Sequence, residues 1–100
     1  MSLVNLGRFV ETKSLLRRTL PVARRVLGQD DHLTLRMRWA YAEALYRDAG
    51  ATLDDRREAV ETLEDTARIA RRVLGGSHPT TSGIEGTLRK SREALRKAKV

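Results

Sequence analysis

The sequence contains no cysteine, two prolines and four aromatic residues among its 100 residues. Without cysteine, disulfides and thiolate chemistry are excluded, which fits a reducing, cytoplasmic setting. No run of 18 apolar residues occurs, so no transmembrane helix is expected. The first four residues, Met1 to Val4, lack the basic and long apolar regions of a secretory signal, so we expect no signal peptide and no membrane contact.

The composition predicts one small all-α domain spanning 1–100. Hydrophobic residues make up 40% and charged residues 33%, too apolar for a wholly disordered chain. Arginine, leucine, alanine and glutamate are abundant and favour helices, whereas proline is scarce. No segment alternates polar and apolar residues with the period of two that is typical of a strand, so we expect none.

The net charge of +7 is concentrated in the last third of the chain. Residues 1–67 carry eleven basic and eleven acidic groups, whereas residues 68–100 carry nine basic groups against two acidic ones. Such an end attracts nucleic acid, an acidic protein or an anionic surface, or simply forms a solvated helix face. The basic patch comprises Arg89, Lys90, Arg92, Arg96, Lys97 and Lys99.

An internal repeat organises the sequence. Residues 24–28 (RRVLG) recur at 71–75, an offset of 47, and nine of the eighteen positions from 11 to 28 are identical at that offset. A period of this length is typical of stacked helical units.

Apolar residues three and four apart predict four helices, at 6–27, 34–49, 54–74 and 80–98. Gly28 and Gly75 follow two of them and can adopt the left-handed conformation that ends a helix. Pro21 lies inside the first helix and predicts a kink without a break. Thr52 and Asp55 resemble a capping box at the start of the third.

The two RRVLG segments, followed by Leu33–Leu35 and by His78–Thr81, resemble the kinesin light chain type of tetratricopeptide repeat (TPR). Residues 5–9 resemble the turn before the second helix of that repeat, and Glu58 and Ala59 match an early pair within it. The resemblance implies an antiparallel helix-pair solenoid fragment. It has half a repeat at 6–27, a full repeat at 34–74 with an extended turn at 50–57, and a degenerate capping helix at 80–98.

Catalytic and cofactor motifs are missing from the sequence. His32 and His78 are expected in loops without metal-ligand spacing, and no nucleophile elbow, P-loop or dinucleotide loop occurs. The acidic residues between 54 and 65 suit a helix start and pairing with nearby arginines. We therefore expect no enzyme, no cofactor and no metal.

The resemblance implies a non-enzymatic module whose first helices line a peptide-binding groove. The candidate peptide-binding residues are Arg36, Trp39, Glu43, Tyr46 and Arg47. The partner would be a protein or peptide with acidic and apolar residues, because arginine grips carboxylates and aromatic rings supply contact area. Trp39 is equally compatible with a packing role between helices. The sequence also permits nucleic-acid binding by the basic patch, or a purely structural role as a spacer.

The first helix leads to a further hypothesis. Phe9, Leu16 and Leu20 lack a preceding helix to cover them, and leaving them wet forgoes roughly 1.5–3 kcal/mol per side chain. A fragment of a longer array, or a homo-oligomer built through this helix, is therefore expected. In the homo-oligomer the acidic stretch 54–65 could meet the basic residues 89–99.

Overall fold

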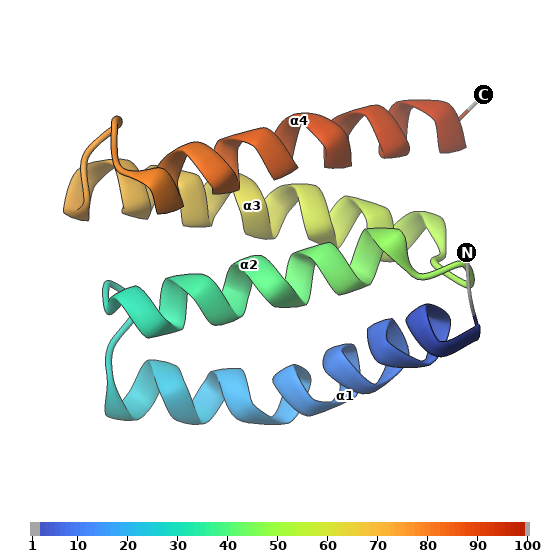
Figure 1. The fold of residues 1–100 in the computed structure, drawn as a ribbon, viewed down its shortest axis with the longest axis horizontal. Helices are drawn as coiled ribbons and strands as arrows, with labels where there is room; N and C mark the ends of the chain where they lie inside the picture. Colours follow the sequence, from blue (N-terminus) through green and yellow to red (C-terminus); the bar gives the residue numbers. More distant parts are fainter. Residues whose placement is uncertain (1–2, 100) are drawn as a thin grey trace.

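The computed structural model describes residues 3–99, and the side chains of residues 8–99, as four helices joined by short connections. They are α1 (Leu3–Val26), α2 (His32–Arg47), α3 (Leu53–Val73) and α4 (Pro79–Ala98), and the described residues contain no strand. Consecutive helices run antiparallel, with α1 and α4 at the two ends of the stack (Figure 1). The predicted all-α helix-pair fold is confirmed.

Helix α2 has the most neighbours. It packs against α1 on one side and α3 on the other, α3 packs against α4, and α4 also touches α2. The fully buried side chains Leu35 and Leu45 of α2, Leu63 of α3 and Ile84 of α4 form the centre of the core. The predicted stripes therefore meet in one core that spans the helices.

The two repeat junctions have the same geometry. Gly28 and Gly75 have φ values of 93° and 94°, the left-handed conformation that ends α1 and α3. The next helix is then capped by Asp31, whose carboxylate accepts from Leu33 N at 2.9 Å, or by His78, whose Nδ1 accepts from Thr80 N at 3.1 Å. The cap at Asp31 starts α2 at His32, earlier than the expected residue 34.

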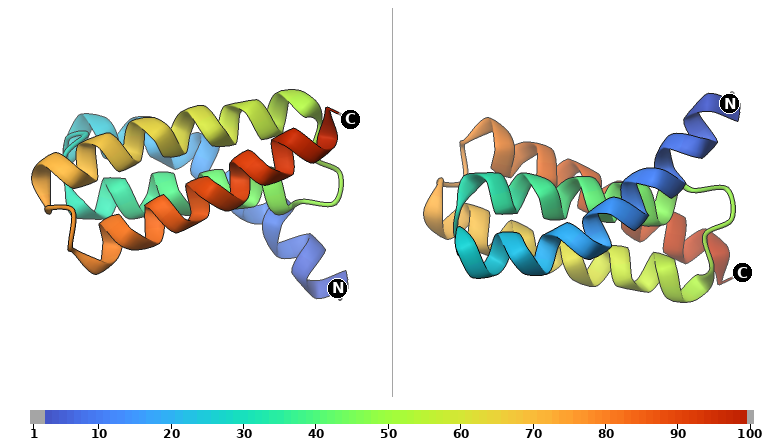
Figure 2. Two further views of the ribbon diagram at one scale, coloured as in Figure 1. Left: turned by 90° about the horizontal axis from the view of Figure 1, so that it is seen from above. Right: turned by 90° about the horizontal axis from the view of Figure 1, so that it is seen from below.

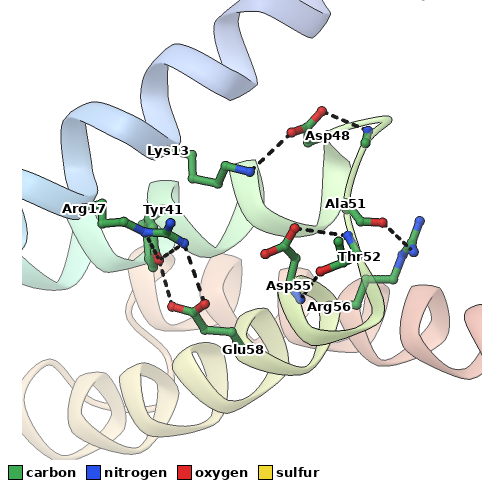
Figure 3. A network of polar contacts seen from close by, with 10 residues as sticks. Lys13, Arg17, Tyr41, Asp48, Ala51, Thr52, Asp55, Arg56 and Glu58 are labelled. Carbon is green, nitrogen blue, oxygen red and sulfur yellow. Dashed lines mark hydrogen bonds and ion pairs between the residues drawn. The ribbon is translucent and has the colours of Figure 1, made fainter.

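The connection from α2 to α3 is shorter than the extended turn expected at 50–57. Thr52 and Asp55 form a full capping box, with Asp55 N donating to Thr52 Oγ1 at 3.1 Å and Thr52 N donating to Asp55 Oδ2 at 3.0 Å (Figure 3). Because the cap satisfies backbone donors at the helix start, residues 53–57 are helical rather than part of the turn.

Helix α1 is longer than expected. Residues 5–9, likened above to a turn, lie within its first turns, so that expectation was wrong. Gly7, within this segment, lowers the stability of a helix by only about 1 kcal/mol, and the helix-favouring residues beside it offset this loss. The helix also continues through Pro21 without a break. It bends, and its N-terminal half diverges from the other helices (Figure 2).

The apolar side chains of α1 that were expected to be uncovered are in fact covered. Leu16 and Leu20 are 8% and 5% exposed, because α2 packs on this face, and Phe9 is half-buried. The exposed apolar residues of α1 lie elsewhere and include Leu15 and Val22. The reason given for self-association is therefore wrong.

Part of the acidic charge of α3 is neutralised within the chain. The carboxylate of Glu64 accepts from Nη2 of Arg92 on α4 at 3.0 Å. One ion pair between 54–65 and 89–99, which was expected between two copies, thus forms inside one molecule.

Arg38 is the most deeply buried charged side chain of α2. It is 5% exposed, and its Nη2 donates to Asp65 Oδ2 of α3 at 2.7 Å. Its Nε and Nη1 are buried without an acceptor among the described residues. The Arg38 hydrogen bond holds the pKa of Asp65 below its ordinary value of 3.8, against the opposing effect of burial.

Close packing between α2 and α4 makes a first prediction possible. A Cβ added at Gly83 would overlap the indole ring of Trp39, whereas one added at Gly86 would meet only the Arg89 guanidinium at 3.7 Å. Gly83→Ala should lower the free energy of unfolding by about 1–3 kcal/mol. Gly86→Ala is the matched control and should be neutral or stabilising by up to about 1 kcal/mol. Urea unfolding followed by circular dichroism measures both, and equal effects would contradict the packing.

The ion pair between buried Arg38 and partly exposed Asp65 predicts an asymmetry between the two residues. Asp65→Ala leaves the Arg38 guanidinium buried without its carboxylate and should cost about 1–3 kcal/mol of stability. Arg38→Met removes the buried charge together with its unpartnered atoms and should change stability by less than about 1 kcal/mol. A larger loss for Arg38→Met than for Asp65→Ala in the same unfolding assay would refute this account.

The lowered pKa of Asp65 predicts an acid-sensitive contribution. A carboxylate whose pKa is lower in the folded state stabilises the fold above its unfolded pKa, and this stabilisation disappears as the pH falls through the folded value. The unfolding free energy of the wild type should therefore fall more steeply below pH 3.8 than that of Asp65→Asn. Parallel pH profiles for the two proteins would show that Asp65 contributes nothing.

Candidate functional site

The five candidate residues on α2 divide into two groups. Arg36 is exposed, and Arg47 is exposed beside Glu43, with 4.0 Å between Arg47 Nη1 and Glu43 Oε2. Trp39 and Tyr46 are half-buried and lie against α4. The five side chains therefore differ in their surroundings, because two of them pack against α4 and two are exposed.

Trp39 is held by α4. Its Nε1 donates to Thr87 Oγ1 at 2.9 Å, and its ring lies directly on Gly83. Only a glycine at position 83 leaves room for the indole. Of the two roles that the sequence allowed for Trp39, packing between helices is therefore the one that its contacts favour.

Tyr46 borders an open groove of about 440 Å³ at the end of the stack where α2 ends, α3 begins and α4 ends. The groove is lined by Tyr46, Arg56, Ala94, Lys97 and Ala98. Tyr46 is one of the candidate residues on α2, and Lys97 belongs to the basic patch. Burial raises the pKa of the Tyr46 hydroxyl, and nearby Glu43 adds to the effect. The groove combines two cations, a phenol and two small apolar side chains.

Of the cations in and beside the groove, Arg56 and Arg47 are held by contacts within the chain, whereas Lys97 is held only weakly. The Nη1 of Arg56 donates to the carbonyl of Ala51 at 2.9 Å, which ties its guanidinium to the α2–α3 connection (Figure 3). The guanidinium of Arg47 lies 5.2 Å from the centroid of the Phe9 ring, a cation–π distance. Lys97 Nζ is 3.9 Å from Glu93 Oε1, an exposed pair that contributes little to stability, so the ammonium can turn to another anion.

The basic patch on α4 is only partly free. Arg92 pairs with Glu64, and Arg96 and Lys97 pair with Glu93. Arg89, Lys90 and Lys99 are exposed and have no carboxylate partner among the described side chains. The unpaired charges are thus fewer than the sequence suggested.

A second cleft, of about 170 Å³, was not anticipated from the sequence. Its lining comes from three helices: Arg17, Leu20, Pro21, Arg24, Tyr41 and Glu58. The Tyr41 hydroxyl donates to Glu58 Oε2 at 2.7 Å and accepts from Nε and Nη2 of Arg17 at 3.3 and 3.2 Å (Figure 3). Burial raises the pKa of Tyr41, and its hydrogen bond to Glu58 acts in the same direction. These polar groups already form hydrogen bonds with one another. We therefore interpret them as a contact that links the three helices and not as a binding site.

The two histidines also meet, although 46 residues separate them. Their ring centroids lie 5.5 Å apart in an edge-to-face arrangement, and His32 Nε2 is 3.0 Å from Thr80 Oγ1. Both stand at the start of a helix, so the repeat itself was the signal that could have placed them together. No group of three or more potential metal-ligating side chains occurs among the described residues.

None of the described helices is both long and apolar enough to cross a membrane.

Comparison with known proteins places this geometry in a family. No curated protein and no solved structure matches the chain. The family model of the tetratricopeptide repeat matches residues 1–34 and 51–80, which together make up more than half of the sequence. The two matched segments include the two repeated junctions, where α1 and α3 each end at a left-handed glycine. The chain belongs to the tetratricopeptide repeat family.

Proposed function

We propose that this chain is a non-enzymatic protein-binding module that holds a peptide in the groove beside Tyr46. Repeats of this family serve as scaffolds for protein–protein interaction. The observation that supports the site is the lining of the groove, which brings Arg56 and Lys97 together with Tyr46. Within the family, the VLG segments and the His78–Pro79 pair favour the kinesin light chain type.

The chemistry of the groove selects an acidic peptide with small apolar residues. Guanidinium and ammonium groups bind carboxylates through charge-assisted hydrogen bonds, and the phenol can donate a further one. Ala94 and Ala98 offer a small apolar surface beside these charges. Arg36 and Arg47 extend the positive surface along α2, and the net charge of +7 accelerates the approach of an acidic partner.

Trp39 does not belong to this site in our proposal. The Trp39 ring packs between α2 and α4. Truncation of this side chain would therefore reduce stability, and it would impair binding only through unfolding. Self-association of the chain is not required for the groove, because all five lining residues come from one molecule.

Lys97→Ala should weaken the binding of a short extended peptide of glutamate and leucine. Loss of a charge-assisted hydrogen bond of roughly 1.5–3 kcal/mol corresponds to about tenfold or more in Kd. Lys99→Ala is the matched control on the same helix and should leave the affinity unchanged. Isothermal titration at two salt concentrations measures both variants, together with melting curves.

Equal weakening by Lys97→Ala and Lys99→Ala would mean that only net charge matters, and would contradict the proposed site. If the peptide does not bind while duplex DNA binds with a steep salt dependence that Arg89→Ala and Lys90→Ala reduce, the chain is a nucleic-acid-binding protein.

A further inference from the structure

A second, apolar surface lies on α1, away from the groove. Leu15, Val22 and Val26 are 57%, 45% and 72% exposed. Their spacings of seven and four residues place them on one side of the helix. This set, called the α1 stripe below, does not face α2, which covers Leu16 and Leu20 instead.

The internal repeat identifies what kind of element fits the α1 stripe. At the offset of 47, Arg18 and Val22 of α1 correspond to Asp65 and Ile69 of α3. Asp65 accepts from Arg38 of α2 at 2.7 Å, and Ile69, one turn further along the same face, is 6% exposed. On α3 this face is covered by a helix, whereas the equivalent face of α1 is open.

The charge on this face is reversed between the two helices. Arg18 stands on α1 where α3 has Asp65, and Arg18 and Arg25 are both exposed. Neither has a carboxylate within ion-pair distance among the described side chains. A helix that covers the α1 stripe as α2 covers α3 would therefore meet a cation where Arg38 meets an anion.

A second copy of this chain fits the stripe poorly. An antiparallel pairing that places Leu15 of one copy on Val22 of the other brings both Arg18 side chains to the twofold axis. Helix α4, at the other end of the stack, does not fit the α1 stripe of a second copy either. Leu35, Ala42 and Leu45, which are fully buried on α2, correspond on α4 to the exposed polar residues Ser82, Arg89 and Arg92.

We propose that the α1 stripe is a docking surface for an amphipathic helix of another polypeptide, one with a glutamate or aspartate opposite Arg18. The apolar side of that helix would cover Leu15 and Val22 in the manner in which α2 covers α3. Its carboxylate would take the position that Arg38 has on α2, with the signs of the pair exchanged.

A charge-exchange titration tests the proposal. The probes are two synthetic amphipathic helical peptides with leucine and alanine at the spacing of Leu35, Ala42 and Leu45. They differ only in having glutamate or arginine at the position that Arg38 occupies in α2. The wild-type chain should bind the glutamate peptide about tenfold more tightly than the arginine peptide, and Arg18→Glu should reverse the preference.

Two aspartate variants separate the stripe from general hydrophobicity. Val22→Asp should abolish binding of both peptides. Val73→Asp is the matched control, because Val73 is 44% exposed on α3 outside the stripe, and should bind as the wild type does. Circular dichroism of each variant verifies that the fold is retained. Lys97→Ala should leave these affinities unchanged, so failure of this surface is distinguishable from failure of the groove.

Three outcomes would overturn the proposal. The first is no binding of either peptide, and the second is equal binding of both by the wild type and Arg18→Glu. The third is a dimer in sedimentation equilibrium that Val22→Asp dissociates, which would assign the stripe to a second copy.

Discussion

The helices of this chain depend on one another to cover their apolar sides, and α2 lies at the centre of that packing. Isolated helices of this length are marginal in water, because nucleation is costly and propensity adds little. Leu35, Ala42 and Leu45 of α2 are completely buried, and α2 contacts all three other helices. The remaining features of the structure depend on how α2 is held between α1 and α3.

Polar contacts determine the register of that packing. Lys13 of α1 lies 3.5 Å from the carboxylate of Asp48, which also accepts from Gly50 N as α2 ends (Figure 3). Halfway along, Arg38 of α2 reaches Asp65 of α3. Buried apolar side chains tolerate small shifts, whereas a displaced ion pair leaves charges unsatisfied. These contacts therefore specify one arrangement of helices among the several that the apolar stripes alone would allow.

Much of the fold could be predicted because its signals are local. The spacing of Leu16 and Leu20, the glycines at 28 and 75 and the cap at Thr52 each depend on neighbours within a few residues. The four helices were therefore found, and the majority of their ends were misplaced by one to three residues. The errors at 50–57 and at 34 arose because hydrogen bonds of Asp55 and Asp31 lengthen the helices beyond their apolar stripes.

The site was less predictable, because it depends on which side of α2 each helix occupies. Helical spacing places Trp39 and Tyr46 close to the face of Arg36 and Glu43, but cannot tell that α4 covers the first two. The contribution of Lys97 to the groove required knowing that the last turn of α4 lies beside the last turn of α2. Likewise, exposure of Leu15 and burial of Leu16 follow from the direction in which α2 approaches α1.

The glycine at position 83 shows how packing restricts the surface available for recognition. A larger residue there would overlap the Trp39 ring, so the indole could not keep its place. With glycine, the indole fills the space between α2 and α4 and its Nε1 is satisfied by Thr87. The half-buried indole thus contributes to the packing of α2 against α4. In the proposed function, the aromatic contact with a peptide is made by Tyr46, near the end of α2, where Arg56 and Lys97 also line the groove.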